Sequence, residues 1–209
     1  MFEPDRRFGK WIFYLQEYAH QPASLHTISV DRIPHVCWSS PKPESHRIEI
    51  LNEGLAYDRC TVGVVTNLDP LDTVPECSIT EPEHIYNVLR TQVDVVLPNG
   101  CSVLNADDEA VVKMAELSDG EVIFFSKYGP NEHTKKHLQK GGRALFTENN
   151  MIILATGSDQ YPLISTANIP LLQASSKTNT LESILAAVAA TWSLNTPKDI
   201  IAAGLQTYQ

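Results

Sequence analysis

A loop rich in carboxylates directly follows an apolar run of the chain. Asp69, Asp72 and Glu76 fall within eight residues, just after the apolar run 60–67. Carboxylate oxygens are the ligands that Mg²⁺ prefers in proteins. Such a loop is able to attract Mg²⁺, and an acidic loop in contact with solvent is the simpler interpretation.

A site for nucleotide phosphates would need a glycine-rich loop that ends in lysine, because its backbone N–H groups cradle the phosphates. The one Gly-Lys pair of the chain is Gly9-Lys10, which Trp11 follows inside a helical pattern. No glycine precedes it, so we expect no phosphate site there. Nor does the spacing of the serines, histidines, cysteines and acids indicate a hydrolytic triad or dyad.

Basic side chains gather on a helix predicted over 131–141. They are His133, Lys135, Lys136, His137 and Lys140. Such a face is able to bind an anionic ligand, and a solvated helix face is the simpler interpretation.

Strands and helices that must position these residues alternate along the chain. The run 60–67 predicts a strand covered on both faces. Thr80 with Glu83 predicts a capping box for a helix from 81 to about 93. A turn at 97–100 leads into a strand at 101–107, and Asp107 or Asp108 is suited to cap a helix over 108–118.

The second half of the chain continues this alternation and adds a hairpin. Asn149-Asn150 separates two β-runs, which is a hairpin signal. Pro197 suits the first position of the last helix. The fold class expected is therefore α/β, a mostly parallel sheet flanked by helices with a small antiparallel piece. The further elements expected are helices at 8–20, 47–57, 181–194 and 197–208, and strands at 25–30, 35–38, 121–126, 143–148, 151–156 and 161–167.

Composition excludes several classes of protein. The chain has 209 residues, 43% of them hydrophobic, and a net charge of −9, which disfavours binding to nucleic acid. No run of apolar residues is long enough to span a membrane, and the N-terminus lacks the features of a secretory signal. Four scattered cysteines without CxxC spacing fit a reducing cytoplasm, so we expect a cytoplasmic protein (Cys37, Cys60, Cys77 and Cys101).

Several strings closely resemble the Mur-ligase-like module of cyanophycin synthetases. They are EGLAYDRCTVGVVTN (53–67), RTQVDVVLPNGCSVLNADD (90–108), MAELSDGEVIFFS (114–126), GGRA (141–144) and LAAVAATW (185–192). The resemblance covers about 44–209 and implies part of a Mur ligase central domain. Residues 1–43 form a divergent segment, for which we expect a helix and a Pro-rich loop.

The resemblance implies ATP-dependent amide ligation through an acyl phosphate, building a polymer of aspartate and arginine, with ATP and Mg²⁺ as cofactors. It assigns Glu44 and Asp72 to the metal, where Thr73 replaces the expected histidine. The expected nucleotide residues are Asn67, Asn179 and Ser183. Ser183 stands where the family has an adenine-contacting asparagine, and the nearby Asn179 is a candidate substitute that the register of the resemblance does not support.

The altered positions and the missing phosphate loop favour a truncated, ligase-like pseudoenzyme with degenerate ATP binding that cannot catalyse alone. The alternative is a non-catalytic interaction module that binds a full-length synthetase or its polymer. A damaged gene product, and a ligase half that receives its phosphate loop from another chain, also stay open. The expected partners are a second copy or a full-length synthetase, with no nucleic acid and no membrane.

Overall fold

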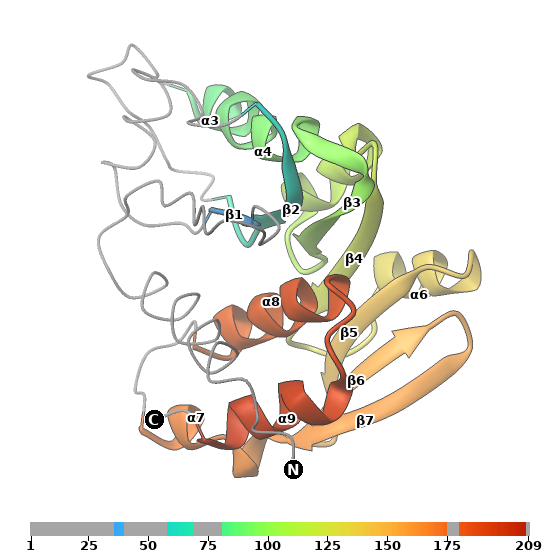
Figure 1. The fold of residues 1–209 in the computed structure, drawn as a ribbon. Helices are drawn as coiled ribbons and strands as arrows, with labels where there is room; N and C mark the ends of the chain where they lie inside the picture. The colour runs from blue at the N-terminus through green and yellow to red at the C-terminus, as the bar shows by residue number, and fades with distance from the viewer. Residues whose placement is uncertain (1–35, 40–57, 69–80, 175–179, 208–209) are drawn as a thin grey trace. The chain divides into compact units, whose positions relative to one another are not determined.

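The computed structural model describes residues 36–39, 58–68, 81–174 and 180–207 (Figure 1). They fall into two compact units that divide between Phe125 and Ser126. We call the described residues up to Phe125 the parallel unit and those from Ser126 onward the antiparallel unit. The boundary predicted at 43/44, the helices predicted at 8–20 and 47–57 and the strand predicted at 25–30 lie outside the described residues.

Four parallel strands form the sheet of the parallel unit. Each pairs with the next along the chain: β1 (Val36–Ser39), β2 (Cys60–Val65), β3 (Val96–Asn105) and β4 (Glu121–Ser126). Val64, Val103 and Ile123 are fully buried, as expected for parallel strands covered on both faces. The strands predicted at 60–67 and 121–126 are confirmed, and the strand predicted at 35–38 is observed one residue later.

Short helices connect these strands. They are α3 (Pro82–Leu89), α4 (Thr91–Asp94), α5 (Glu109–Lys113) and the 3₁₀ helix η2 (Met114–Leu117). Helix α4 lies so close to β2 that a Cβ atom on Gly63 would be 2.7 Å from the carbonyl oxygen of Gln92. Only glycine fits at this contact between helix and strand.

The turn predicted at 97–100 is wrong, because these residues belong to β3. The pairing steps from Cys60–Val96 to Val62–Cys101, so β3 carries extra residues as a bulge. A Cβ atom on Gly100 would lie 2.5 Å from the carbonyl oxygen of Thr61. The Pro-Asn-Gly string resembles a turn, but its glycine is needed because two strands approach each other closely there.

The capping box predicted at Thr80 is also wrong. Helix α3 has Glu81 as its N-cap, with no hydrogen bond from a capping side chain, and Pro82 in its first turn. Proline favours the first helical position, and this sets the start of the helix. The cap of α5 is confirmed as Asp108, whose Oδ1 accepts from the N–H groups of Ala110 (2.9 Å) and Val111 (3.2 Å).

The antiparallel unit holds a three-stranded sheet and four α-helices in its described residues. Strands β5 (Arg143–Glu148), β6 (Met151–Thr156) and β7 (Asp159–Ser165) pair in chain order. The helices are α6 (Glu132–Gln139), α7 (Pro170–Ala174), α8 (Thr180–Ser193) and α9 (Lys198–Thr207), and a 3₁₀ turn, η3 (Thr166–Asn168), precedes α7. Helix α7 was not predicted, and α9 begins one residue after Pro197. The α/β class with a small antiparallel piece is confirmed.

Helix α8 is buried almost all round, with every residue from Ile184 to Ala190 inaccessible or nearly so. An apolar helix of this kind belongs inside a core. Within the described parts of the chain, no helix has the length and apolar character needed to cross a membrane.

The predicted hairpin between β5 and β6 is confirmed. Asn149 and Asn150 have φ of 50° and 60°, the left-handed pair that a tight two-residue turn requires. Asparagine tolerates this conformation better than other residues with a Cβ atom.

We expect Asn150→Ala to lower the free energy of unfolding by about 1 kcal/mol, whereas Asn150→Gly leaves it unchanged or raises it. Chemical denaturation measures both. Glu148→Ala, at an exposed neighbouring position, is the matched control and should have little effect. Equal losses for the alanine and glycine variants would contradict the role assigned to the turn.

Candidate functional site

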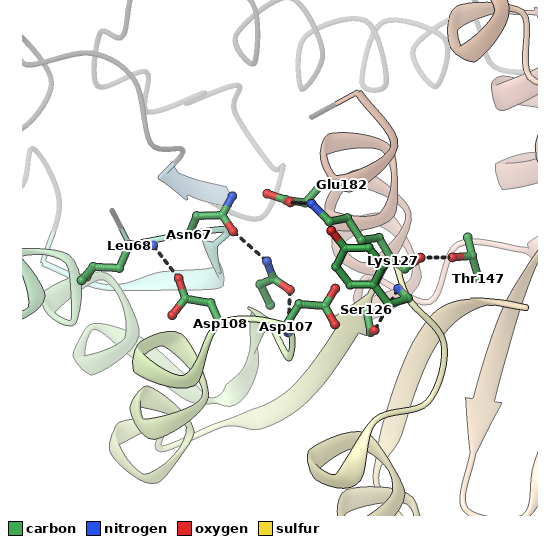
Figure 2. Close-up of polar contacts among 10 residues, drawn as sticks. Asn67, Leu68, Asp107, Asp108, Ser126, Lys127, Thr147 and Glu182 are labelled. Carbon is green, nitrogen blue, oxygen red and sulfur yellow. Dashed lines mark hydrogen bonds and ion pairs between the residues drawn. The ribbon is translucent and has the colours of Figure 1, made fainter. Parts of the chain in front are cut away.

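In the parallel unit, polar residues gather at the carboxyl ends of β2 and β3. In open parallel sheets, ligands bind at this edge. Asn67 follows β2, Asn105 ends β3, and Asp107 and Asp108 come next in the chain (Figure 2). Their hydrogen bonds therefore decide what this edge is able to do.

Asn105 is buried, with 1% of its surface exposed, and both ends of its amide are engaged. Its Nδ2 donates to Oδ1 of Asn67 at 2.8 Å, and its Oδ1 accepts from the backbone N–H of Asp107 at 2.9 Å (Figure 2). An amide donates and accepts through separate atoms, so it can make both bonds at once. Asn105 thus ties the segment after β2 to the turn that leads into α5.

Asp108 uses both carboxylate oxygens on backbone groups. Its Oδ1 caps α5, and its Oδ2 accepts from the N–H of Leu68 at 2.8 Å (Figure 2). Three N–H donors thus occupy most of the acceptor sites of this carboxylate. The side chain holds a helix start against the segment after β2.

These residues do not fit a magnesium ion. Among the residues that the structure describes, no three His, Cys, Asp or Glu side chains gather in a way that could hold a metal. Asp108, the acid at the strand ends with the clearest partners, is already bonded to three backbone groups. Glu44 and Asp72, which the resemblance assigns to the metal, lie outside the described residues.

The nucleotide residues expected from the resemblance fall in different units or outside the described residues, so their grouping stays a prediction. Asn67 is half-buried and accepts the hydrogen bond of Asn105. Ser183 is half-buried in the first turn of α8, in the antiparallel unit. Asn179 lies outside the described residues. Asn105 was missed, although a polar residue that ends an apolar strand just before a helix cap was a usable signal.

A second polar group lies in the antiparallel unit and was also missed. Lys127 follows β4, and its Nζ is 3.1 Å from Oε2 of Glu182 in α8 (Figure 2). The side chain of Glu182 is 5% exposed and that of Lys127 23%. Burial by itself lowers the pKa of Lys127, but the hydrogen bond and charge of Glu182, with smaller contributions from Tyr128, raise the pKa above its ordinary value.

Hydrogen bonds fix the backbone around Lys127. The hydroxyl of Thr147 donates to the carbonyl oxygen of Lys127 at 2.5 Å, and that of Ser126 donates to the carbonyl oxygen of Gly129 at 2.7 Å. Tyr128 projects outward, 80% exposed, with Nζ of Lys127 5.1 Å from its ring centroid. The turn thus presents an aromatic ring beside a fixed cation, and no local sequence pattern indicates that the lysine pairs with Glu182.

The curated relatives of this chain show that it belongs to the cyanophycin synthetase family. No family model matches the chain. It is 31% identical over 188 residues to cyanophycin synthetase from Nostoc sp., covering 90% of this chain and 20% of that protein. To the synthetase from Crocosphaera subtropica it is 32% identical over 166 residues, covering 79% and 19%. The chain spans about a fifth of the length of the curated relatives it matches.

A solved structure supports the fold. A pseudomurein peptide ligase type C from Methanothermus fervidus superposes with a TM-score of 0.51 at 17% identity, covering 97% of this chain and 47% of that one. At this identity the likeness shows a shared fold. The resemblance expected from the sequence is confirmed.

We expect Asn105→Ala to lower the free energy of unfolding by about 1–3 kcal/mol, because it removes the partner of two polar groups at the strand ends. Urea denaturation measures the loss. Asn87→Ala, on the exposed side of α3, is the matched control and should be nearly neutral. A neutral Asn105→Ala would show that the amide does not hold this edge together.

We expect Lys127→Met to lower the free energy of unfolding by about 3 kcal/mol, since it leaves the buried carboxylate of Glu182 without its cation. Lys136→Met is the matched control, because Lys136 pairs with the exposed Glu132 and should have a much smaller effect. A comparable loss in both variants would contradict the burial argument.

The pH dependence of this loss follows from the pKa of Lys127. A lysine whose pKa is raised on folding contributes its stability fully below its unfolded pKa and loses it as the pH rises through the folded pKa. The difference between wild type and Lys127→Met should therefore stay constant between about pH 7 and pH 9 and shrink above the ordinary lysine pKa. A difference that shrinks already below pH 9 would contradict the raised pKa.

Proposed function

We propose that this chain, a relative of one segment of cyanophycin synthetase, keeps the fold of an ATP-dependent amide ligase without carrying out ligation by itself. The observation that carries this proposal is the hydrogen bonding of Asn105 and Asp108 at the carboxyl ends of the parallel strands. At the edge of the sheet where a ligand would bind, these polar groups form hydrogen bonds that stabilise the fold.

A ligase that works through an acyl phosphate must aim charged and hydrogen-bonding groups at phosphates, metal and amine. In the described part of this edge, the amide of Asn105 and the carboxylate of Asp108 instead form hydrogen bonds with neighbouring residues of the same chain. Opening them toward a ligand would leave part-buried N–H groups without these partners, and a fully buried N–H group in that state costs about 1–3 kcal/mol.

The sequence adds two supports. The 209 residues contain no Gly-Lys-Thr or Gly-Lys-Ser string, and Ser183 stands where the resemblance implies an adenine-contacting asparagine. A hydroxyl cannot donate and accept through separate atoms as an amide does. ATP and Mg²⁺ are therefore expected to bind weakly or not at all to this chain alone.

A second candidate function is an interaction module that binds a full-length synthetase or its polymer. Tyr128 is the observation that favours it, because an 80% exposed tyrosine beside a fixed lysine is the type of side chain enriched at protein interfaces. Four scattered cysteines without CxxC spacing support the proposal that the protein works in a reducing cytoplasm.

Thermal unfolding with Mg-ATP, combined with a phosphate-release assay, tests the proposal. A ligand present at about 100 times its Kd raises the melting temperature of a domain this size by about 5–10 °C. We expect no such rise and no phosphate release, with a full-length cyanophycin synthetase as the positive control. A rise accompanied by release would overturn the proposal.

Binding of a full-length synthetase to the immobilised chain separates the two candidates. If the chain is an interaction module, the synthetase binds and Tyr128→Ser weakens that binding. Tyr161→Ser, at the other exposed large hydrophobic side chain of the described residues, leaves it unchanged. No binding to the synthetase or to its polymer at any concentration would exclude this second function.

A further inference from the structure

Strand β7 has one edge that no other described strand pairs with. Its register with β6 runs from Asp159 opposite Thr156 to Ser165 opposite Met151, and it is the last strand in the order of the sheet (Figure 1). The first four residues of β7, 159–162, are all exposed. A free edge of this kind presents backbone N–H and C=O groups with which a strand of another chain is able to pair.

Pro162 lies in the middle of this strand, opposite Ile153. Proline has no backbone N–H, so a strand tolerates it where its nitrogen faces away from the partner strand. In an antiparallel pair, opposite residues alternate between those that exchange two hydrogen bonds and those whose backbone groups face outward. Pro162 therefore takes an outward position, and its nitrogen and carbonyl group face the free edge.

The turn before β7 leads to the same assignment independently. Residues 157–158 connect β6 to β7, and Gly157 has a φ of 56°, which suits the first position of a type II′ turn. In a two-residue hairpin, the pair next to the turn exchanges both hydrogen bonds. Counting from Asp159, which belongs to that pair, the next two outward positions are Gln160 and Pro162.

A bulge follows Pro162 directly. The register with β6 skips Leu163, so this residue is an extra one in β7, and both Leu163 and Ile164 are buried. A bulge bends the strand that carries it. The regular free edge is therefore limited to 159–162, and Gln160 and Pro162 are its outward positions.

We propose that Pro162 closes the free edge of β7 to pairing with β7 of a second copy of this chain. Two such edges are able to meet antiparallel about a two-fold axis, with Gln160 of each copy opposite position 162 of the other. With proline at 162, each of these pairs lacks the N–H that would donate to the carbonyl oxygen of Gln160. The proline ring also occupies the place of that N–H, which faces the incoming strand.

The rest of the regular edge is suited to pairing, so the proline decides the outcome. Tyr161 would lie at the two-fold axis, opposite Tyr161 of the second copy, and aromatic pairs across strands are favourable. Its ring is 42% exposed, and Nζ of Lys198 lies 4.2 Å from the ring centroid. The charged residue of the stretch, Asp159, lies at its end.

Sedimentation velocity of Pro162→Thr over a range of protein concentrations is the first test. Threonine favours strands and supplies the missing N–H. We expect the variant to form particles of about twice the mass of the wild-type particle as its concentration rises. A variant that sediments like wild type at every concentration would overturn the proposal.

A second variant separates edge pairing from aggregation of a destabilised protein. Gln160→Pro added to Pro162→Thr removes the N–H at the other outward position, so the double variant should sediment like wild type. Pro130→Thr, outside the strands, is the matched control and should leave the mass unchanged. Circular dichroism checks that all three variants are folded. Association that persists in the folded double variant would refute the proposal.

Hydrogen exchange locates the contact. When Pro162→Thr associates, the backbone amides of Gln160 and of position 162 should exchange more slowly than in the dilute, unassociated variant. The amide of Asp159 already faces β6 and should change little. Slower exchange confined to other parts of the chain would show that another surface makes the contact, and the role assigned to Pro162 would be wrong.

Discussion

The buried amide of Asn105 holds together the carboxyl end of the parallel sheet. It donates to Asn67 after β2 and accepts from the backbone of Asp107. These two bonds fix the turn that places Asp108, and Asp108 in turn binds the backbone of Leu68 and caps α5. A buried amide must satisfy both ends, so the positions of its neighbours follow from it.

This constraint bears on function because the same edge of an open α/β sheet is where ligands usually bind. A protein is able to keep its fold and lose its activity, because activity depends on a few side chains that the fold positions. Here the fold is shared with ligases, while the described side chains at the strand ends bond to one another. In the antiparallel unit, Lys127 and Glu182 likewise form an ion pair with each other.

The elements predicted correctly are those whose sequence signals lie within the element itself. β2, β4, α8 and the Asn149-Asn150 turn follow from apolar runs and turn residues, and they are confirmed. The turn predicted at 97–100 was wrong because glycine there serves a close approach between strands, which local pattern does not reveal. The position of Asn105 carried a usable local signal, but its bond to Asn67 and the pairing of Lys127 with Glu182 could not be predicted, since these partners lie 38 and 55 residues away in the chain. Glu44, Asp72 and Asn179 stay predictions.

The most direct test of the central claim observes the side-chain amide of Asn105 itself. In ¹⁵N-labelled protein, its NH₂ resonances should exchange slowly with solvent and keep their positions when Mg-ATP is added in excess, because the group stays bonded to Asn67. Saturable shifts of these resonances with Mg-ATP, together with faster exchange, would show that the strand ends open to a nucleotide. That result would contradict the claim that the polar side chains at the carboxyl ends of the parallel strands stabilise the fold and do not bind a nucleotide.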